Sequence, residues 1–177
     1  RVRDEHQASG GGAVGTAHVR SGFHERMTGI HRIRLTAAHA SVMTESAIGG
    51  YPAEVCGILV GRETDGTGTV VRVVPTRNAA TADSDRRYEI PPADLVHEQR
   101  ASREAGMRIL GFYHSHPDQP AVPSSHDLDL AWPEYVYVIV PVAGGRADSP
   151  RGWQLTGNRS RFTEVALHVS REVTRWA

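Results

Sequence analysis

The sequence contains no lysine, because all 20 of its basic residues are arginine. Chemistry that depends on a lysine amine, such as Schiff-base formation, is therefore excluded for this sequence. Cysteine is nearly absent as well, since Cys56 is the only one. An internal disulfide and a multi-cysteine zinc site are thus excluded too. A single cysteine also fits a reducing compartment, and we expect a cytoplasmic protein.

Net charge and long apolar runs are also missing. The 20 basic and 20 acidic residues cancel, so the chain has no overall positive field of the kind that attracts nucleic acid or anionic lipid. The longest apolar runs, such as residues 136–142, are far shorter than the roughly 20 residues of a membrane-spanning helix. We expect no nucleic-acid partner and no membrane association. A neutral surface permits a homodimer without requiring one.

The length of 177 residues favours a single domain. Residues 1–29 are rich in Gly, Arg and His and show no apolar period, so they are predicted to form a disordered or loosely docked tail. Met27 precedes the first patterned segment by a few residues. Our hypothesis is that the functional part of the chain starts at Met27 and that its folded domain occupies residues 30–177.

Strand-like and helix-like patterns alternate through this domain. Strands are predicted over 30–35, 55–60, 70–74, 88–90, 107–113, 135–142, 153–156 and 162–169, and helices over 36–48, 91–106 and 124–131. Gly61 is predicted to end the second strand, and the turn at Asp65-Gly66 predicts an antiparallel hairpin with the third. Strands that dominate over two or three packed helices indicate a mixed α/β fold.

The strongest chemical signal is the stretch HSHPDQPAVPSSHD, residues 114–127. His114 and His116 end a predicted strand, where residues two apart point to the same side, so both imidazoles can face one point. Asp127 lies in the first turn of the next predicted helix. If the loop returns Asp127 to that point, two histidines and a carboxylate make a three-ligand zinc site with a fourth position open for water. Zinc lowers the pKa of such a water to about 7.

A water nucleophile also needs a proton acceptor that is not itself a metal ligand. Glu54, just before the predicted strand 55–60, is the candidate general base. The hydroxyl of Ser124 could donate a hydrogen bond to the oxygen that becomes negative on the attacked carbonyl. These five residues together predict a hydrolase.

The same residues resemble the motif of the JAMM (JAB/MPN) zinc metalloproteases. The resemblance rests on Glu54 with the following VCGILVG, on HSHP, on the seven-residue interval and on SxxD, and it extends over roughly residues 30–170, including RYEIPPADL. It implies a mixed, mainly antiparallel curved sheet with an architecture like that of the cytidine deaminases. It also implies that Zn²⁺ is held by His114, His116 and Asp127, with Glu54 as general base and Ser124 as oxyanion helper.

Members of this family cleave bonds at the C-terminal glycines of ubiquitin or ubiquitin-like proteins. The chain resembles the small prokaryotic branch, since few residues separate Ala131 from the strand at Tyr135 and leave little room for a ubiquitin-gripping insertion. The resemblance implies a zinc-dependent isopeptidase or peptidase that hydrolyses the bond after the C-terminal Gly-Gly of a ubiquitin-like or sulfur-carrier protein.

Two other hypotheses compete with this enzyme. A noncatalytic binding module could use the same fold to hold a carrier tail or a partner subunit. A cytidine-deaminase-like zinc enzyme is disfavoured, because it requires paired cysteines.

Several residues near the motif have simpler interpretations. His126 and Asp129 should point away from the metal on their helix, Asp118 is a turn former, and Cys56 is a small buried residue. The tryptophans, Trp132, Trp153 and Trp176, are interpreted as core or rim aromatics.

Overall fold

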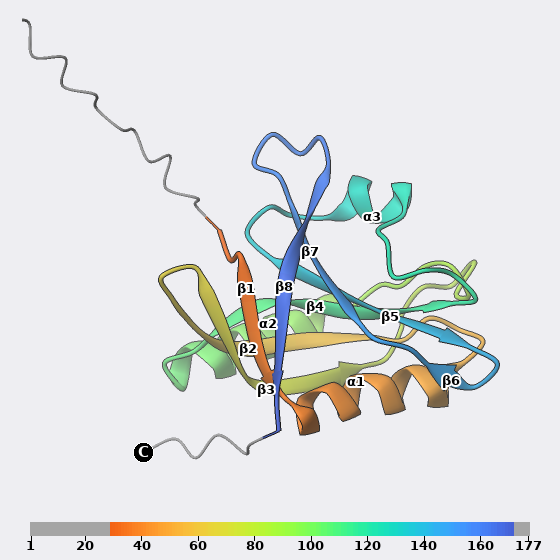
Figure 1. Cartoon of the computed structure of the whole chain (residues 1–177), viewed down its shortest axis with the longest axis horizontal. Coiled ribbons are helices and arrows are strands. Elements are labelled where there is room, and N and C mark those ends of the chain that lie inside the picture. The colour runs from red at the N-terminus through yellow and green to blue at the C-terminus, as the bar shows by residue number, and fades with distance from the viewer. Residues whose placement is uncertain (1–28, 172–177) are drawn as a thin grey trace, which may run out of the picture.

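The computed structural model describes residues 29–171 (Figure 1). The predicted tail, apart from Gly29, and Trp176 lie outside the described residues. Within the described range, the elements follow in the order β1 (Arg32–Thr36), α1 (Ala37–Gly50), β2 (Cys56–Thr64), β3 (Thr67–Thr76), α2 (Pro92–Glu104), β4 (Arg108–Pro117), α3 (Ser125–Leu130), β5 (Val136–Ala143), β6 (Arg146–Ala147), β7 (Arg151–Leu155) and β8 (Phe162–Ser170). No helix of this range combines the length and the hydropathy needed to span a membrane.

The strands form one strongly curved sheet. Their hydrogen-bonded order is β4-β2-β3-β1-β8-β7-β5-β6, and β4 also pairs with β5, so the pairings return to their starting strand. Of the eight pairings among the described strands, five are antiparallel and three are parallel. The mixed, mainly antiparallel α/β fold is confirmed.

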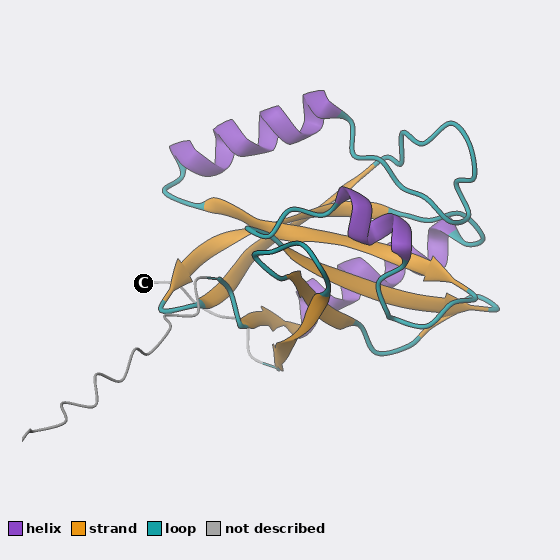
Figure 2. Cartoon of the chain, turned by 90° about the horizontal axis from the view of Figure 1, so that it is seen from above, coloured by secondary structure: helices purple, strands orange, loops and turns teal. Residues whose placement is uncertain are grey.

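Helices cover both faces of the sheet (Figure 2). On one side, here called the α1 face, Met43 and Ala47 of α1 pack on apolar strand residues that include Leu59 and Val138. On the other side, the α2–α3 face, Ala131 packs with Ile58 and other apolar residues. Apolar burial on two faces is the main source of stability in such a layered domain.

The pairing of β2 with β4 contains an irregularity. Leu59 lies opposite Gly111, whereas the next residue, Val60, lies opposite Ile109. Leu110 is therefore an extra residue in β4, as in a β-bulge. A Cβ at Gly111 would collide with the backbone of β5, so this position of the bulge requires glycine.

The irregularity changes which side chains share a face. Leu110 and Tyr113, three positions apart, both pack on the α1 face, and Phe112 packs on the α2–α3 face. Regular alternation resumes after Phe112. His114 and His116 consequently share the α2–α3 face with Phe112.

The predicted hairpin is confirmed, with one correction. Asp65 and Gly66 both have positive φ, 48° and 69°, as the type I′ turn of a two-residue hairpin requires. The prediction that Gly61 ends its strand is wrong, because β2 continues to Thr64. Gly61 instead lies at a register shift in the pairing with β3, where the missing side chain allows a close approach of the Thr69 backbone.

The predicted strand at 88–90 is also wrong, because these residues lie in the loop between β3 and α2. Both edges of β2 are already occupied, by β3 and by β4, so the segment has no free edge there. The backbone of segment 88–90 is bound by the Asn78 side chain instead of a strand, since Glu89 N donates to Asn78 Oδ1 at 3.0 Å. The sequence analysis also missed β6, which is only two residues long.

Candidate active site

The two histidines end β4 and face each other. His114 has no exposed surface and His116 is only 7% exposed. Their Nε2 atoms are 3.0 Å apart. The predicted convergence of the two imidazoles is therefore present in the structure.

The surroundings of each ring fix its orientation. His116 Nδ1 lies 2.9 Å from the carbonyl oxygen of Pro120, which can only accept, so Nδ1 carries the proton and Nε2 of the neutral ring keeps its lone pair. The ring of His114 stacks on Tyr88 with centroids 4.4 Å apart. Within residues 29–171, no hydrogen-bond partner reaches His114 Nδ1.

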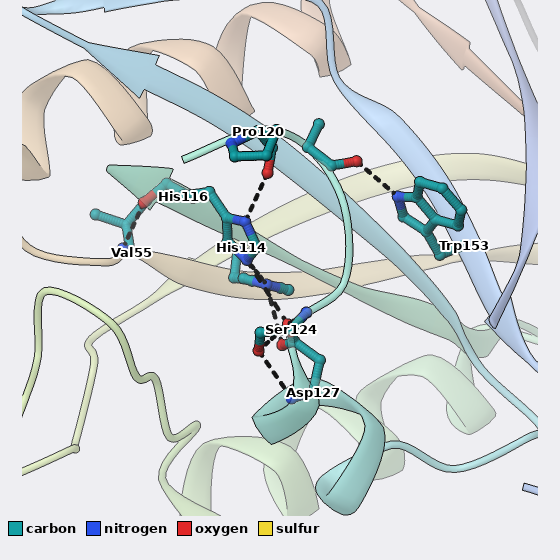
Figure 3. Close-up of polar contacts among 9 residues, drawn as sticks. Val55, His114, His116, Pro120, Ser124, Asp127 and Trp153 are labelled. Atoms are coloured by element: carbon teal, nitrogen blue, oxygen red, sulfur yellow. Dashed lines mark hydrogen bonds and ion pairs between the residues drawn. The ribbon is translucent and has the colours of Figure 1, made fainter. Parts of the chain in front are cut away.

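Asp127 reaches the histidines from α3 because the helix begins in a capping box. The N-cap residue is Ser124, whose Oγ accepts from Asp127 N at 3.1 Å while Ser124 N donates to Asp127 Oδ2 at 2.7 Å. This reciprocal arrangement locks the carboxylate in place. Asp127 Oδ1 lies 3.2 Å from His114 Nε2, and Oδ2 lies 3.7 Å from His116 Nε2 (Figure 3).

These three side chains form a candidate metal centre. One ligand atom from each of His114, His116 and Asp127 lies within 4.8 Å of the other two, and this group could hold a metal ion. Two imidazole nitrogens and one carboxylate oxygen suit zinc, and three protein ligands are typical of catalytic zinc sites. The hydrogen bond from His116 Nδ1 to a carbonyl is also usual for a metal-binding histidine.

Burial and hydrogen bonding act against each other at the metal centre. Burial alone raises the pKa of Asp127, but the interactions with His114, His116 and Ser124 outweigh it, so the net pKa is lowered. Burial lowers the pKa of His114. An ionised carboxylate beside a neutral imidazole is the state that binds a metal cation.

Glu54 lies just before β2 and is almost completely buried, at 6% exposure. Burial raises its pKa to about 7, with Asp127 and Asp85 also raising it and His116 lowering it. Cys56 pairs with His114 in the antiparallel β2–β4 ladder, so Glu54, two residues before Cys56, lies at the end of β4 that carries the two histidines. A carboxyl with a pKa near neutrality is suited to general acid–base catalysis.

The backbone around Glu54 is tied to β4 through Ser115, the residue between the two histidines. Val55 N donates to Ser115 Oγ at 2.9 Å, and Ser115 N donates to Val55 O at 3.0 Å. Because Ser115 and the histidines belong to one strand, these bonds set the position of Glu54 relative to the metal centre. The sequence analysis did not single out Ser115, although its place within HSHP could have drawn attention to it.

Ser124, the fifth predicted residue, lies beside the carboxylate. Its Oγ donates to Asp127 Oδ2 at 2.6 Å. The hydroxyl thus sits at the mouth of the site on the N-cap of α3. The structure therefore brings Ser124 to the group as well.

Asp118, Asp129 and Cys56 lie as their simpler interpretations predicted, and that of His126 stays a prediction. Asp129 is exposed, and Asp118 has a φ of 54° and accepts a hydrogen bond from the Tyr51 hydroxyl at 3.0 Å, as a turn residue can. Cys56 is fully buried directly opposite His114. Burial raises the pKa of this thiol to about 11, so it stays protonated at neutral pH.

A mostly apolar cavity of about 590 Å³ adjoins the metal centre. Its lining includes Asp127, Tyr88, Phe112, Leu130, Trp132 and Tyr135. Trp132 is 61% exposed, which makes it a rim residue rather than a core residue. The cavity therefore leaves open space beside the candidate metal centre.

The fold and the site together define an α/β domain with a candidate metal centre and a buried acid, Glu54. The family model "Prokaryotic homologs of the JAB domain" matches residues 36–156. This chain therefore belongs to that family, as the resemblance of its motif predicted.

Individual relatives agree with this assignment. The desampylase of Haloferax volcanii is 45% identical over 124 residues, which cover 70% of this chain and 84% of the relative. The CysO-cysteine peptidase of Mycobacterium tuberculosis is 30% identical over 141 residues, which cover 79% of this chain and 92% of the relative. A solution structure of a Desulfitobacterium hafniense protein superposes with a TM-score of 0.70 at 27% identity, covering 80% of this chain and 94% of that one.

Proposed function

We propose that this protein is a zinc-dependent peptidase or isopeptidase that cleaves the bond after the C-terminal Gly-Gly of a ubiquitin-like or sulfur-carrier protein. The observation that carries the proposal is the meeting of three ligand atoms within 4.8 Å next to a buried acid whose pKa is raised to about 7. Both parts of this arrangement support hydrolysis, because the three ligand atoms can hold a Lewis acid and the buried acid can transfer a proton.

His114, His116 and Asp127 would hold the zinc ion. Zinc supplies Lewis acidity, which makes water nucleophilic near neutral pH and polarises a carbonyl group. The capping box and the bond from His116 Nδ1 to Pro120 O hold the ligands in place before a metal arrives. Such preorganisation reduces the cost of assembling the site.

Glu54 would move the proton. Hydrolysis adds a hydroxyl to the carbonyl carbon and a hydrogen to the leaving nitrogen, so one group must take a proton from water and deliver it to the amine. The carboxylate of Glu54 accepts that proton and then donates it. Its raised pKa makes both transfers feasible near pH 7.

Ser124 would stabilise the oxygen of the attacked carbonyl through a hydrogen bond from Oγ. In the described structure this hydroxyl donates to Asp127 Oδ2. Rotation about one side-chain bond is enough to redirect it. A donor of this kind typically contributes on the order of 100- to 1000-fold in turnover.

The substrate class comes from the relatives. A desampylase and a CysO-cysteine peptidase act on conjugates of ubiquitin-like or sulfur-carrier proteins, and this chain covers 84% and 92% of their lengths. Two glycines have no side chains, so an extended Gly-Gly tail can pass close to buried ligands where other residues would clash. A protein with such a tail therefore fits the site.

The test uses fusions of Gly-Gly-tailed carrier proteins, each extended by a different residue or joined to a lysine side chain. We expect zinc-loaded protein to cut after the second glycine, as read by mass spectrometry, and a chelator to stop the reaction. Glu54→Gln should retain zinc and lose cleavage. Protein that takes up no zinc when it is offered, and that binds the carrier without cutting it, would instead support the noncatalytic binding module.

A further inference from the structure

Asn78, at the start of the loop between β3 and α2, makes four side-chain hydrogen bonds. Its Nδ2 donates to the backbone oxygens of Glu54 at 3.0 Å and Arg87 at 2.8 Å. Its Oδ1 accepts from the backbone nitrogens of Ala80 at 2.9 Å and Glu89 at 3.0 Å. An amide side chain has two N–H donors and two acceptor lone pairs, so the capacity of Asn78 is fully used.

These bonds shape the whole segment 77–91, here called the 77–91 loop. The bonds to Arg87 and Glu89 bring the end of the loop back to its beginning, together with a backbone bond from Ala79 N to Glu89 O at 2.8 Å. The middle of the loop then contacts the acid, because Glu54 N donates to Ser84 O at 2.6 Å. Glu54 is thus held by the loop at its N–H and at its carbonyl group.

The same loop also reaches a metal ligand. Tyr88, between two residues whose backbones Asn78 binds, stacks on the ring of His114 with an interplanar angle of 21°. One polar side chain therefore organises contacts to the acid on β2 and to a histidine on β4. No other described side chain hydrogen-bonds to both Glu54 and the far end of the 77–91 loop.

We propose that Asn78 is a positioning residue for Glu54. The inference rests on the proposed hydrolysis, and it assigns to Asn78 the placement of the proton acceptor rather than contact with the substrate. Proton transfer requires heavy atoms within about 3 Å of each other, and an error of about 1 Å in a catalytic group can cost on the order of 100-fold in rate. Glu54 lies in irregular backbone before β2 begins, so it depends on such side-chain support.

A purely structural role for Asn78 predicts a different result. If Asn78 only stabilised the loop, its loss would lower the melting temperature and leave turnover of the folded enzyme unchanged. If it positions Glu54, turnover falls while metal binding and substrate binding are retained. The experiment therefore measures zinc content, kcat, KM and melting temperature for each variant.

Asn78→Asp is the sharpest variant. It keeps an oxygen that accepts from Ala80 N and Glu89 N, but it replaces the donor to Glu54 O and Arg87 O with a second oxygen. The kcat values are compared on the plateau of each variant's pH profile, where kcat no longer rises with pH. On the plateau, a shift of the Glu54 pKa caused by the new charge does not affect the comparison. Asn78→Ala, which adds no charge and removes all four bonds, is the second variant.

Asn158→Asp is the matched control. Asn158 lies in the turn between β7 and β8, and its Oδ1 accepts from Thr156 and Ser160. The substitution makes the same chemical change at an exposed residue whose hydrogen-bond partners lie in its own turn. We expect it to leave every measured quantity unchanged.

For Asn78→Asp we expect kcat to fall about 10- to 100-fold, KM to stay within about twofold and zinc to remain at the wild-type ratio. We also expect no additivity with Glu54→Gln: the double variant should turn over no more slowly than Glu54→Gln alone, because Asn78 acts through that side chain. Hydrogen exchange at the Ala80 and Glu89 amides should rise in Asn78→Ala and stay low in Asn78→Asp.

Three results would overturn the assignment: wild-type kcat in both Asn78 variants, a loss of kcat that follows loss of zinc, or full additivity with Glu54→Gln. Failure of the proposed function is a separate outcome, because it appears as zinc-loaded wild-type protein that cuts no Gly-Gly fusion. In that case exchange at the Ala80 and Glu89 amides still tests the hydrogen bonds of Asn78.

Discussion

The two faces of β4 differ in composition although they alternate along one strand. On the α1 face, Leu110 and Tyr113 pack in a continuous apolar core. On the α2–α3 face, Phe112 is followed by His114 and His116, which meet polar partners from α3 and the preceding loops. Because neighbouring residues of a strand point to opposite sides, one strand supplies core packing on one face and the candidate metal ligands on the other. Changes on the two faces should therefore have separable effects.

The largest expected effect is that of Glu54→Gln, beside the α2–α3 face. General acid–base catalysis contributes roughly 100- to 10,000-fold, so kcat should fall by that range while zinc content and melting temperature stay close to wild type. Steady-state cleavage of a Gly-Gly fusion and metal analysis measure this. Near-wild-type cleavage by this variant would show that Glu54 is not the general base. The proposed catalytic role of the α2–α3 face would then lose its proton acceptor.

Ser124→Ala should lower kcat by about 100- to 1000-fold if the hydroxyl donates to the developing oxyanion. The same change removes the N-cap of α3 and should cost about 1 kcal/mol of unfolding free energy. Ser125→Ala, one residue further and exposed, is the matched control and should alter neither quantity. Equal activities of the two variants would argue against an oxyanion role.

Leu110→Ala tests the opposite face. Leu110 is fully buried, and the cavity left by the substitution should lower the unfolding free energy by about 2–5 kcal/mol. The kcat of the folded fraction should change less than about twofold, since the side chain points away from the site. Leu130→Ala, at a residue that is 58% exposed, should change stability by less than about 0.5 kcal/mol. Denaturant unfolding provides both values.

Cleavage should fall in acid because Glu54 must be ionised to accept a proton. Its pKa is raised to about 7, and the positive charge of a bound cation would lower it, so the acidic limb should have an apparent pKa at or below about 7. Below that value kcat should drop about tenfold per pH unit. Zinc content measured at each pH separates this limb from loss of metal, and Glu54→Gln should lack the limb.

The smallest expected effect concerns Cys56. Although it lies opposite His114, burial raises its pKa to about 11, so the thiol should react slowly with iodoacetamide at pH 8 in the native protein and readily after unfolding. Cleavage should survive treatment of the native protein. Rapid inactivation matched by alkylation of Cys56 would mean that the α2–α3 face holds a second reactive group.

Local patterns predicted much of this protein correctly. The repeat of apolar residues indicated β5 and β8, the Asp65-Gly66 pair indicated the hairpin, and the S-x-x-D sequence placed Asp127 in the first turn of a helix. These features depend on interactions between residues close in the chain. They could therefore be derived without knowledge of the fold.

Contacts between distant segments could not be derived in this way. The loop at Tyr88 was predicted as a strand because its residues favour extended backbone, yet β2 has no free edge there. Strict alternation along β4 would also place Leu110 on the histidine face. Only the register shift opposite Leu59 and Val60 moves it to the α1 face.

By itself, the amino-acid sequence predicted the five candidate site residues and the family of the chain, because the motif is a short pattern whose spacing follows strand and helix geometry. Tertiary structure alone decided that Glu54 would be buried with a pKa of about 7 and that Asn78 would hold it. Both features arise where segments far apart in the chain exclude water from one another, and the strength of a charge or a hydrogen bond depends on that exclusion.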